Sequence, residues 1–207
     1  MPTPQFLTLP GRQNSGSGHW QTLWEQRFGY VRVEQHDWDA PLRGDWITRL
    51  EDVVLAGASQ TAMLLNSEQQ TTYSRRQTDD LTQKIERTNI IFVAHSLGCH
   101  LVAAWAAVSP SVARVRGALL VAPPDVERAD WPGVLHSWRK PALQALPFKA
   151  TCVLSTNDPF GSLAAGRALA AAWGAQCVEL GAAGHINAGS GLGEWPAGRA
   201  MLLDLTG

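Results

Sequence analysis

The sequence contains few cysteines, and these do not form a pattern. Cys99, Cys152 and Cys177 are an odd, scattered set in 207 residues. Such a set does not indicate a disulfide framework, and its spacing fits no metal site. The first residues, 1–5, also lack the basic and apolar regions of a signal peptide. We therefore expect a cytoplasmic protein with reduced cysteines, and neither a metal nor an organic cofactor.

Charge of one sign and long apolar runs are also missing. Lysine and arginine total 17 against 18 aspartates and glutamates, which gives a net charge of −1. No basic run or basic face stands out, so a nucleic-acid partner is not expected. The longest apolar runs are far shorter than a membrane span requires. What remains is a chain of globular composition, long enough to form one domain with a substantial core.

Short β-rich runs alternate with longer helical patterns along the chain. Residues 90–94 are continuously apolar, which is typical of a central parallel strand buried on both faces. The alternation predicts an α/β fold of three layers, with a mostly parallel central sheet of about six strands and helices on both faces. Strands are predicted at residues 6–9, 30–34, 90–94, 117–122, 151–155 and 177–180, and helices at 19–28, 46–54, 97–108, 163–173 and 195–205.

One segment does not fit this alternation. Residues 57–88 are rich in Gln, Thr, Ser and charge, and they contain few large apolar residues. A polar stretch of this length predicts a surface insertion within a single domain that spans residues 1–207. The alternatives are a lid or an oligomer contact, so a homodimer stays open.

Ser96 is the first candidate for chemistry. It directly follows the buried strand at 90–94 and precedes a helical run, which is the context of a nucleophile elbow in an α/β-hydrolase fold. The strained turn needs small residues two positions before and after the serine, and these are Ala94 and Gly98. The turn also places the Leu97 amide at a helix start, where it can donate to an oxyanion. The competing interpretation is a serine that only caps the helix.

An acid and a histidine should follow the nucleophile in that order. Asp158 and His185 each come just after a predicted strand, so both should lie at the same edge of the sheet as Ser96. His185 would act as the general base, and Asp158 would orient it. Asp125 and Asp130, which follow the preceding strand, are rival acids.

The loop after the first strand, residues 9–20, is the expected source of a second oxyanion donor. Arg12 is the first candidate and Gly11 the second, because Pro10 has no N–H. His19 either points into the same cleft or contacts backbone at the helix start. The chain also has nine tryptophans, most of which we expect in the core. We include Trp20 and Trp38 as candidate pocket residues, because indole offers an apolar face and one donor.

Several longer segments extend this pattern: Pro10-Gly11, Gly18 to Glu25, Asp37 to Pro41, Val93 to Cys99, Val121 to Val126 and Gly184 to Pro196. With these segments the chain resembles the small serine hydrolases related to retinoblastoma-binding protein 9, a compact branch of the α/β-hydrolases. The resemblance implies a triad at Ser96, Asp158 and His185 and hydrolysis of an ester or related acyl substrate. Residues 57–88 are longer than is usual in that branch.

Two functions of different classes follow from these observations. The first is a serine hydrolase, carboxylesterase-like, that acts on a small acyl substrate through an acyl-enzyme. Thioesterase and amidase activity are sibling chemistries on the same triad. The alternative is a protein-binding module that keeps the hydrolase scaffold with little catalysis, because a fold does not determine a function.

Overall fold

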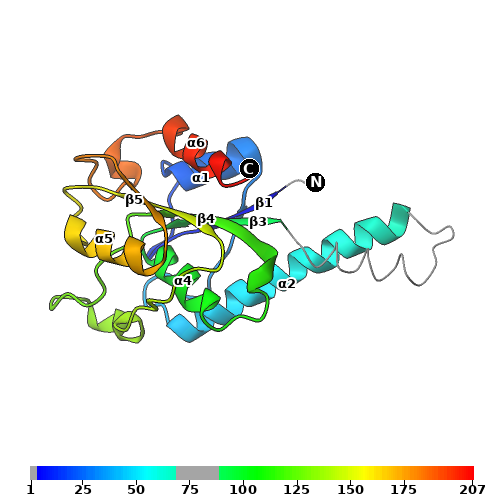
Figure 1. The fold of residues 1–207 in the computed structure, drawn as a ribbon, viewed down its shortest axis with the longest axis horizontal. Helices are drawn as coiled ribbons and strands as arrows, with labels where there is room; N and C mark the ends of the chain where they lie inside the picture. The colour runs from blue at the N-terminus through cyan, green and yellow to red at the C-terminus, as the bar shows by residue number, and fades with distance from the viewer. Residues whose placement is uncertain (1–3, 69–88) are drawn as a thin grey trace.

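A computed structural model describes residues 4–68 and 89–207, without the side chains of residues 57–68. Six strands form one sheet in the order β2-β1-β3-β4-β5-β6, and every neighbouring pair is parallel (Figure 1). This confirms the predicted α/β class with a parallel six-stranded sheet. The strands are β1 (Gln5–Leu9), β2 (Val31–Arg32), β3 (Ile90–His95), β4 (Val115–Val121), β5 (Lys149–Leu154) and β6 (Gln176–Glu179).

Helices cover both faces of the sheet, so the fold has three layers. In Figure 1, α1 and α6 lie above the sheet, whereas α2, α4 and α5 lie below it. The helices are α1 (Trp20–Phe28), α2 (Arg43–Glu68), α4 (Leu97–Ala106), α5 (Leu163–Ala172) and α6 (Pro196–Asp204), and short 3₁₀ turns occur at Val112–Arg114, Gly133–Trp138 and Ala188–Ser190.

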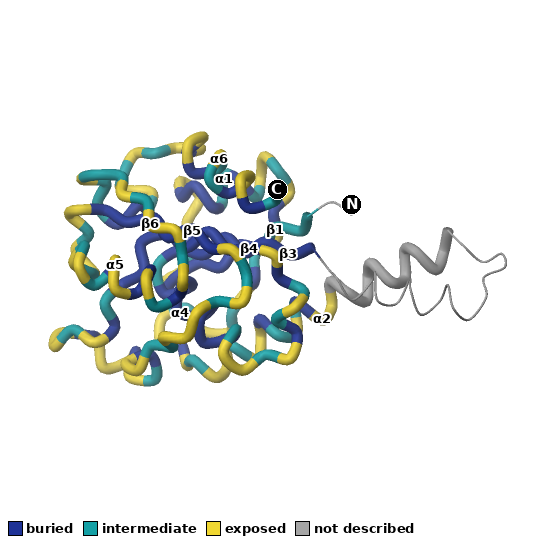
Figure 2. Tube along the Cα trace, in the orientation of Figure 1, coloured by how far each residue is buried: buried dark blue, intermediate teal, exposed yellow. Residues whose placement is uncertain are grey.

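The central strand β3 supplies both halves of the core by alternation. Phe92 and Ala94 belong to the cluster on the α2, α4 and α5 face, whereas Ile91 and Val93 belong to the cluster on the α1 and α6 face. Side chains along a strand point to opposite faces in turn, so a continuously apolar strand fills two cores at once. Figure 2 shows the buried chain concentrated along these strands. Tryptophans complete both clusters, as expected, and those fully buried are Trp20, Trp24, Trp46, Trp105, Trp138 and Trp173.

Two elements differ from the prediction. The strand expected at residues 30–34 is paired only at Val31 and Arg32, because β2 is the edge strand and has β1 as its single neighbour. The second helix, expected at 46–54, continues as α2 to Glu68, so residues 57–68 of the expected insertion continue this helix. Residues 69–88 of that insertion lie outside the described residues.

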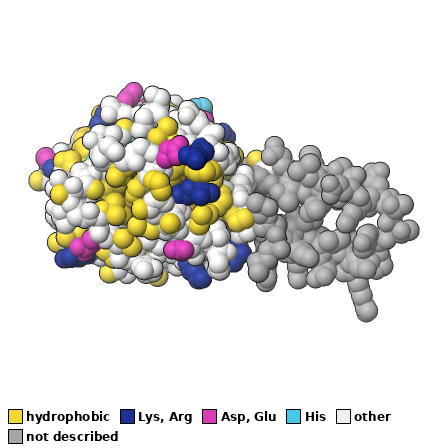
Figure 3. Space-filling view, turned by 90° about the horizontal axis from the view of Figure 1, so that it is seen from above, with side chains coloured by type: hydrophobic (Ala, Val, Ile, Leu, Met, Phe, Trp, Pro, Cys, Tyr) yellow, Lys and Arg dark blue, Asp and Glu magenta, His cyan; other side chains and the backbone are white. Residues whose placement is uncertain are grey.

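The surface gives no sign of a membrane span. No helix within residues 4–68 and 89–207 combines the length and apolar character needed to cross a bilayer. Figure 3 shows the face above the sheet, where a few basic and acidic side chains lie scattered among hydrophobic and neutral ones. This mixture agrees with the balanced charge of the sequence.

Glu51 links α2 to the end of α4. Its carboxylate accepts hydrogen bonds from the indole N–H of Trp105 at 2.7 Å, from Ser109 Oγ at 2.6 Å and from Ser111 Oγ at 2.5 Å. Burial disfavours the charged carboxylate, but these three donors outweigh it and hold the pKa of Glu51 below its ordinary value. The ionised form is therefore the one that holds the two helices together.

We expect Glu51→Ala to lower the free energy of unfolding by about 2 kcal/mol, because the buried Trp105 donor loses its partner. Glu51→Gln should lower the free energy of unfolding by less. Asp52 lies on the exposed side of the same helix, so Asp52→Ala should leave the free energy of unfolding within about 0.5 kcal/mol of wild type. The measurement is urea unfolding followed by circular dichroism.

The same contact should depend on pH. A carboxyl with a lowered pKa stabilises the folded state above its unfolded pKa, and this stabilisation disappears as pH falls through the folded pKa. The advantage of wild type over Glu51→Gln should therefore be full at pH 7 and should shrink below the ordinary value of 4.5. An advantage that grows on acidification would contradict this.

Candidate active site

Ser96 lies in a strained turn between β3 and α4. Its backbone has φ 54° and ψ −124°, which an L-residue with a side chain adopts only when the surroundings hold it there. The Ser96 amide donates to the Val121 carbonyl at 2.9 Å, and the Ser96 carbonyl accepts from the Cys99 amide at 3.0 Å. These bonds fix the turn to β4 on one side and to α4 on the other. Ser96 itself stays partly exposed.

The turn is so tightly packed that two neighbouring positions accept only glycine. A Cβ on Gly98 would stand 2.1 Å from the carbonyl oxygen of Leu9, at the end of β1. A Cβ on Gly11 would stand 2.6 Å from the Cβ of Ser96. Ala94, two residues before the serine, is fully buried, and its single methyl fits within the core.

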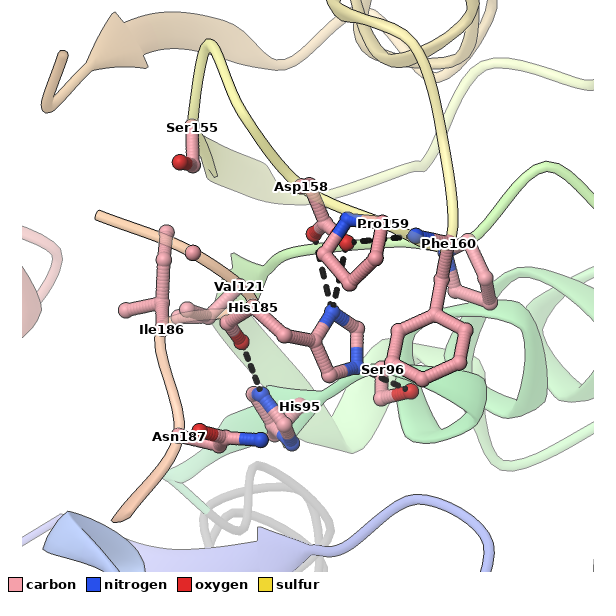
Figure 4. A network of polar contacts seen from close by, with 12 residues as sticks. His95, Ser96, Val121, Ser155, Asp158, Pro159, Phe160, His185, Ile186 and Asn187 are labelled. Carbon is pink, nitrogen blue, oxygen red and sulfur yellow. Dashed lines mark hydrogen bonds and ion pairs between the residues drawn. The ribbon is translucent and has the colours of Figure 1, made fainter. Parts of the chain in front are cut away.

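His185 and Asp158 lie beside Ser96 in one hydrogen-bonded row (Figure 4). His185 Nδ1 is 2.8 Å and 3.0 Å from the two carboxylate oxygens of Asp158. A carboxylate can only accept, so Nδ1 carries the proton and Nε2 is left as an acceptor. Ser96 Oγ then donates to His185 Nε2 at 2.9 Å. The Asp158 and His185 side chains are only 7% and 8% exposed, so solvent does not compete for this row.

The loops that carry the acid and the histidine are joined to each other. Ser155 Oγ donates to Asn157 Oδ1 and to the Gly181 carbonyl, and it accepts from the Ala183 amide at 2.9 Å. Asn157 Oδ1 also accepts from the Gly184 amide at 2.7 Å. These bonds fix the relative positions of Asp158 and His185, because Asp158 directly follows Asn157 and His185 directly follows Gly184.

The structure places the two rival acids elsewhere. Asp125 accepts from the Glu127 amide within its own loop. Asp130 forms an ion pair with Arg128, and its side chain is 70% exposed. Within residues 4–68 and 89–207, neither forms a hydrogen bond with His185, whereas both carboxylate oxygens of Asp158 contact it.

Two residues that line the cavity with Ser96 have backbone amides without a hydrogen-bond acceptor among the described residues. The Leu97 amide is the first of α4, and first-turn amides have no partner within their helix. The Arg12 amide likewise donates to no acceptor in the described part of the chain, and both residues line the same cavity. Loop contacts hold Arg12 in place: its Nε donates to the Asp39 carbonyl at 2.9 Å, and the Gln13 amide donates to the Trp38 carbonyl at 2.8 Å.

Two further histidines form a row with His185. The His95 ring lies 4.8 Å from the His185 ring and 4.7 Å from the His19 ring, between centroids. His95 Nε2 donates to the backbone carbonyl of His185 at 2.9 Å, as Figure 4 shows. The sequence predicts His95 to be a packing residue on the opposite side of the turn from Ser96, whereas the structure places its ring against those of His185 and His19. The signal that could have found it is strand alternation, which places His95 on the same face as Val93, the face of α1 and α6.

A cavity of about 480 Å³ surrounds Ser96 and His185. Of the predicted pocket residues, Gly11, Arg12 and His19 line it, but Trp20 and Trp38 do not. Trp20 is buried, and its indole N–H donates to the Ile186 carbonyl at 2.8 Å, so it holds the residue after His185. Trp38 packs against Trp46 below the sheet. Sequence reasoning missed Leu135, Phe160 and Asn187, which also line the cavity.

The described residues offer no alternative centre of metal or thiol chemistry. Within residues 4–68 and 89–207, no group of three His, Cys, Asp or Glu side chains is arranged to hold a metal ion. Cys99 and Cys152 are buried and Cys177 is exposed, and all three are free. Burial raises the pKa of Cys99 and Cys152, so neither is a ready nucleophile.

The chain belongs to the serine hydrolase family, which matches residues 6–67 and 60–204. This confirms the predicted class of small serine hydrolases. A search of curated proteins found no match. Three solved structures share the fold. A protein described as a YdeN-like hydrolase from Pectobacterium atrosepticum is 23% identical, with a TM-score of 0.72 over 99% of this chain and 91% of that one.

The second structure, the ydeN gene product of B. subtilis, is 17% identical, with a TM-score of 0.65 over 98% of both chains. The third is a thermophilic esterase from Thermogutta terrifontis with butyrate bound. It is 13% identical, with a TM-score of 0.63 over 97% of this chain and 81% of that one. At these identities the likeness concerns the fold.

The contact at Gly98 generates a stability prediction. Gly98→Ala should lower the free energy of unfolding by about 3 kcal/mol or more, because the backbone carbonyl of Leu9 cannot move aside as a side chain can. Gly133→Ala is the matched control, since a Cβ there meets nothing within 4 Å, and it should change stability by less than about 0.5 kcal/mol. Urea unfolding measures both. Equal effects of the two substitutions would contradict the prediction.

Proposed function

We propose that this protein hydrolyses a carboxylic ester with a small acyl group through an acyl-enzyme on Ser96, with His185 and Asp158 as its catalytic partners. The observation that carries the proposal is the continuous row from Ser96 Oγ to His185 Nε2, at 2.9 Å, and from His185 Nδ1 to Asp158, at 2.8 Å. Membership of the serine hydrolase family supports it independently.

Acylation begins when Ser96 Oγ attacks the ester carbonyl carbon and His185 Nε2 takes the hydroxyl proton. The carbonyl oxygen becomes an oxyanion, for which the amides of Leu97 and Arg12 are the donors. Asp158 stabilises the imidazolium through its hydrogen bond to Nδ1. The intermediate collapses when the bond to the alcohol oxygen breaks and His185 Nε2–H protonates that oxygen. The alcohol leaves, and the acyl group stays on Ser96.

Deacylation repeats these steps with water as the nucleophile. His185 Nε2 takes a proton from water as the water oxygen attacks the acyl carbon, and the same two amides hold the second oxyanion. His185 then returns the proton to Ser96 Oγ, which releases the carboxylic acid. The fixed tautomer of His185 serves both halves of the reaction, because the proton stays on Nδ1, hydrogen-bonded to Asp158, throughout.

Labelling with an active-site fluorophosphonate tests the nucleophile. Wild type should label on Ser96, and Ser96→Ala should neither label nor turn over short-chain esters, with kcat lower by a factor on the order of 10⁵ to 10⁶. Intact-protein mass spectrometry locates the label. Esterase turnover that survives Ser96→Ala would overturn the proposal, and partner binding without any hydrolysis would favour a binding module.

Two matched substitutions test the acid. Asp158→Asn should lower kcat by about 10⁴-fold, because an amide in this place favours the wrong tautomer of His185. Asp125→Asn removes the same charge from the neighbouring loop and should leave kcat near wild type, since the Asp125 carboxylate accepts from the Glu127 amide in its own loop and, within the described residues, forms no hydrogen bond with His185. The reverse pattern in steady-state ester hydrolysis would assign the acid to Asp125.

A further inference from the structure

The loop between β1 and α1, which carries the Arg12 amide, contains two adjacent residues in the left-handed region of backbone conformation. Gln13 has φ 66° and Asn14 has φ 62°, and neither is a glycine. Residues with a side chain persist in this region only when their surroundings hold them there. Because Gln13 and Asn14 directly follow Arg12, the contacts that hold them also set where the Arg12 peptide unit lies.

Arg32 of β2 supplies the contacts at the second of these residues. Its Nη1 donates to Asn14 Oδ1 at 3.0 Å and to the Ser15 carbonyl at 3.2 Å. Asn14 Oδ1 also accepts from the Ser15 amide at 2.7 Å. Arg32 therefore holds both a side chain and the backbone at the point where the loop leaves the left-handed pair.

The guanidinium of Arg32 is itself fixed by α1. Its Nε and Nη2 donate to the two carboxylate oxygens of Glu25 at 3.0 Å and 2.6 Å, and Nη2 also donates to Thr22 Oγ1 at 2.6 Å. Glu25 in turn accepts from the hydroxyl of Thr8, a buried residue of β1. With the two bonds to the loop, all five N–H groups of Arg32 have an acceptor. A planar fork bound in this way has one orientation, which directs Nη1 at the loop.

A second ion pair at the opposite edge of the sheet shows what attachment of a helix alone requires. Arg167 of α5 donates through Nε to Glu179 of β6 at 2.7 Å, and the two side chains are 57% and 35% exposed. Arg32 and Glu25 also join a helix to an edge strand, but both are only 15% exposed. Burial of an ion pair carries a desolvation cost that this attachment does not need. The additional bonds of Arg32 are those to the loop.

We infer that Arg32 is a positioning residue for the oxyanion hole, which holds residues 12–15 so that the Arg12 amide stays directed at the developing oxyanion. Glu25 fixes the guanidinium that does this. The inference rests on the proposed esterase function and adds a residue that acts through the loop, because Arg32 is not among the described residues that line the cavity.

Arg32→Lys tests the inference. The lysine ammonium keeps the charge, but its three donors form no planar fork and cannot serve Glu25 and the loop together. For a short-chain ester, kcat should fall by about 10- to 100-fold, with KM within about twofold of wild type, because the oxyanion bonds form in the transition state. Arg167→Lys makes the same change in the exposed ion pair and should leave kcat and KM unchanged.

Inhibition by butylboronic acid separates positioning from a general loss of structure. Ser96 Oγ adds to boron and gives a tetrahedral adduct that resembles the transition state. Its inhibition constant in Arg32→Lys should rise by the factor by which kcat/KM falls. Thermal unfolding shows whether each variant is folded.

Glu25→Gln decides the question if Arg32→Lys does not fold. It leaves Arg32 in place with a neutral partner that offers one acceptor oxygen. This variant should lower kcat by a smaller factor, again with KM unchanged and with a matching rise in the inhibition constant.

The outcomes separate this inference from the proposed function. An unchanged kcat in the folded variant, or a loss of kcat without a matching loss of boronate affinity, overturns the positioning role while the esterase function stands. A wild type that hydrolyses no ester and does not react with fluorophosphonate overturns the proposed function, and this inference with it.

Discussion

The contact between Gly98 and the carbonyl of Leu9 is the constraint on which the rest of the site depends. With a hydrogen in place of a side chain, α4 can begin directly against the end of β1, where a Cβ would stand 2.1 Å from the Leu9 oxygen. The approach holds Ser96 at φ 54° and brings Gly11 under its side chain. Leu97 and Arg12 line one cavity with Ser96. The same close packing therefore positions the proposed nucleophile and the residues proposed to supply the oxyanion donors.

The parallel sheet brings the three catalytic candidates to one edge, but it does not orient them. Ser96, Asp158 and His185 each follow the carboxyl end of a strand, and these ends meet in any parallel sheet. Their orientation comes from loop hydrogen bonds, chiefly those of Ser155 and Asn157 to the backbone around Gly184. Such bonds explain why the short polar residues Ser155 and Asn157 precede Asp158 in its loop.

This division sets how much could be predicted from the sequence. Hydrophobic runs and chain order predict the strand ends, the elbow, and an acid that precedes a histidine. The parallel sheet and the positions of Ser96, Asp158 and His185 could therefore be predicted from the sequence. Side-chain direction was harder. Trp20 was a candidate pocket residue because indole offers an apolar face and one donor, yet its indole N–H donates to the Ile186 carbonyl inside the core. The edge position of β2 depends on which strand pairs with it, which no local pattern encodes.

His19, His95 and His185 lie in a row, and burial gives the first two a different protonation behaviour from the one that the proposed mechanism requires of His185. Burial lowers the pKa of His95 well below its usual value and that of His19 to about 4, so both rings stay neutral beside His185, which gains a proton in the proposed mechanism. A second imidazolium 4.8 Å from the His185 ring would oppose that step, because like charges at this separation in a buried site repel strongly. Neutral rings avoid this repulsion and still supply N–H donors. His95 donates to the His185 backbone carbonyl, whereas His19 Nε2 is buried and has no hydrogen-bond partner among the described residues.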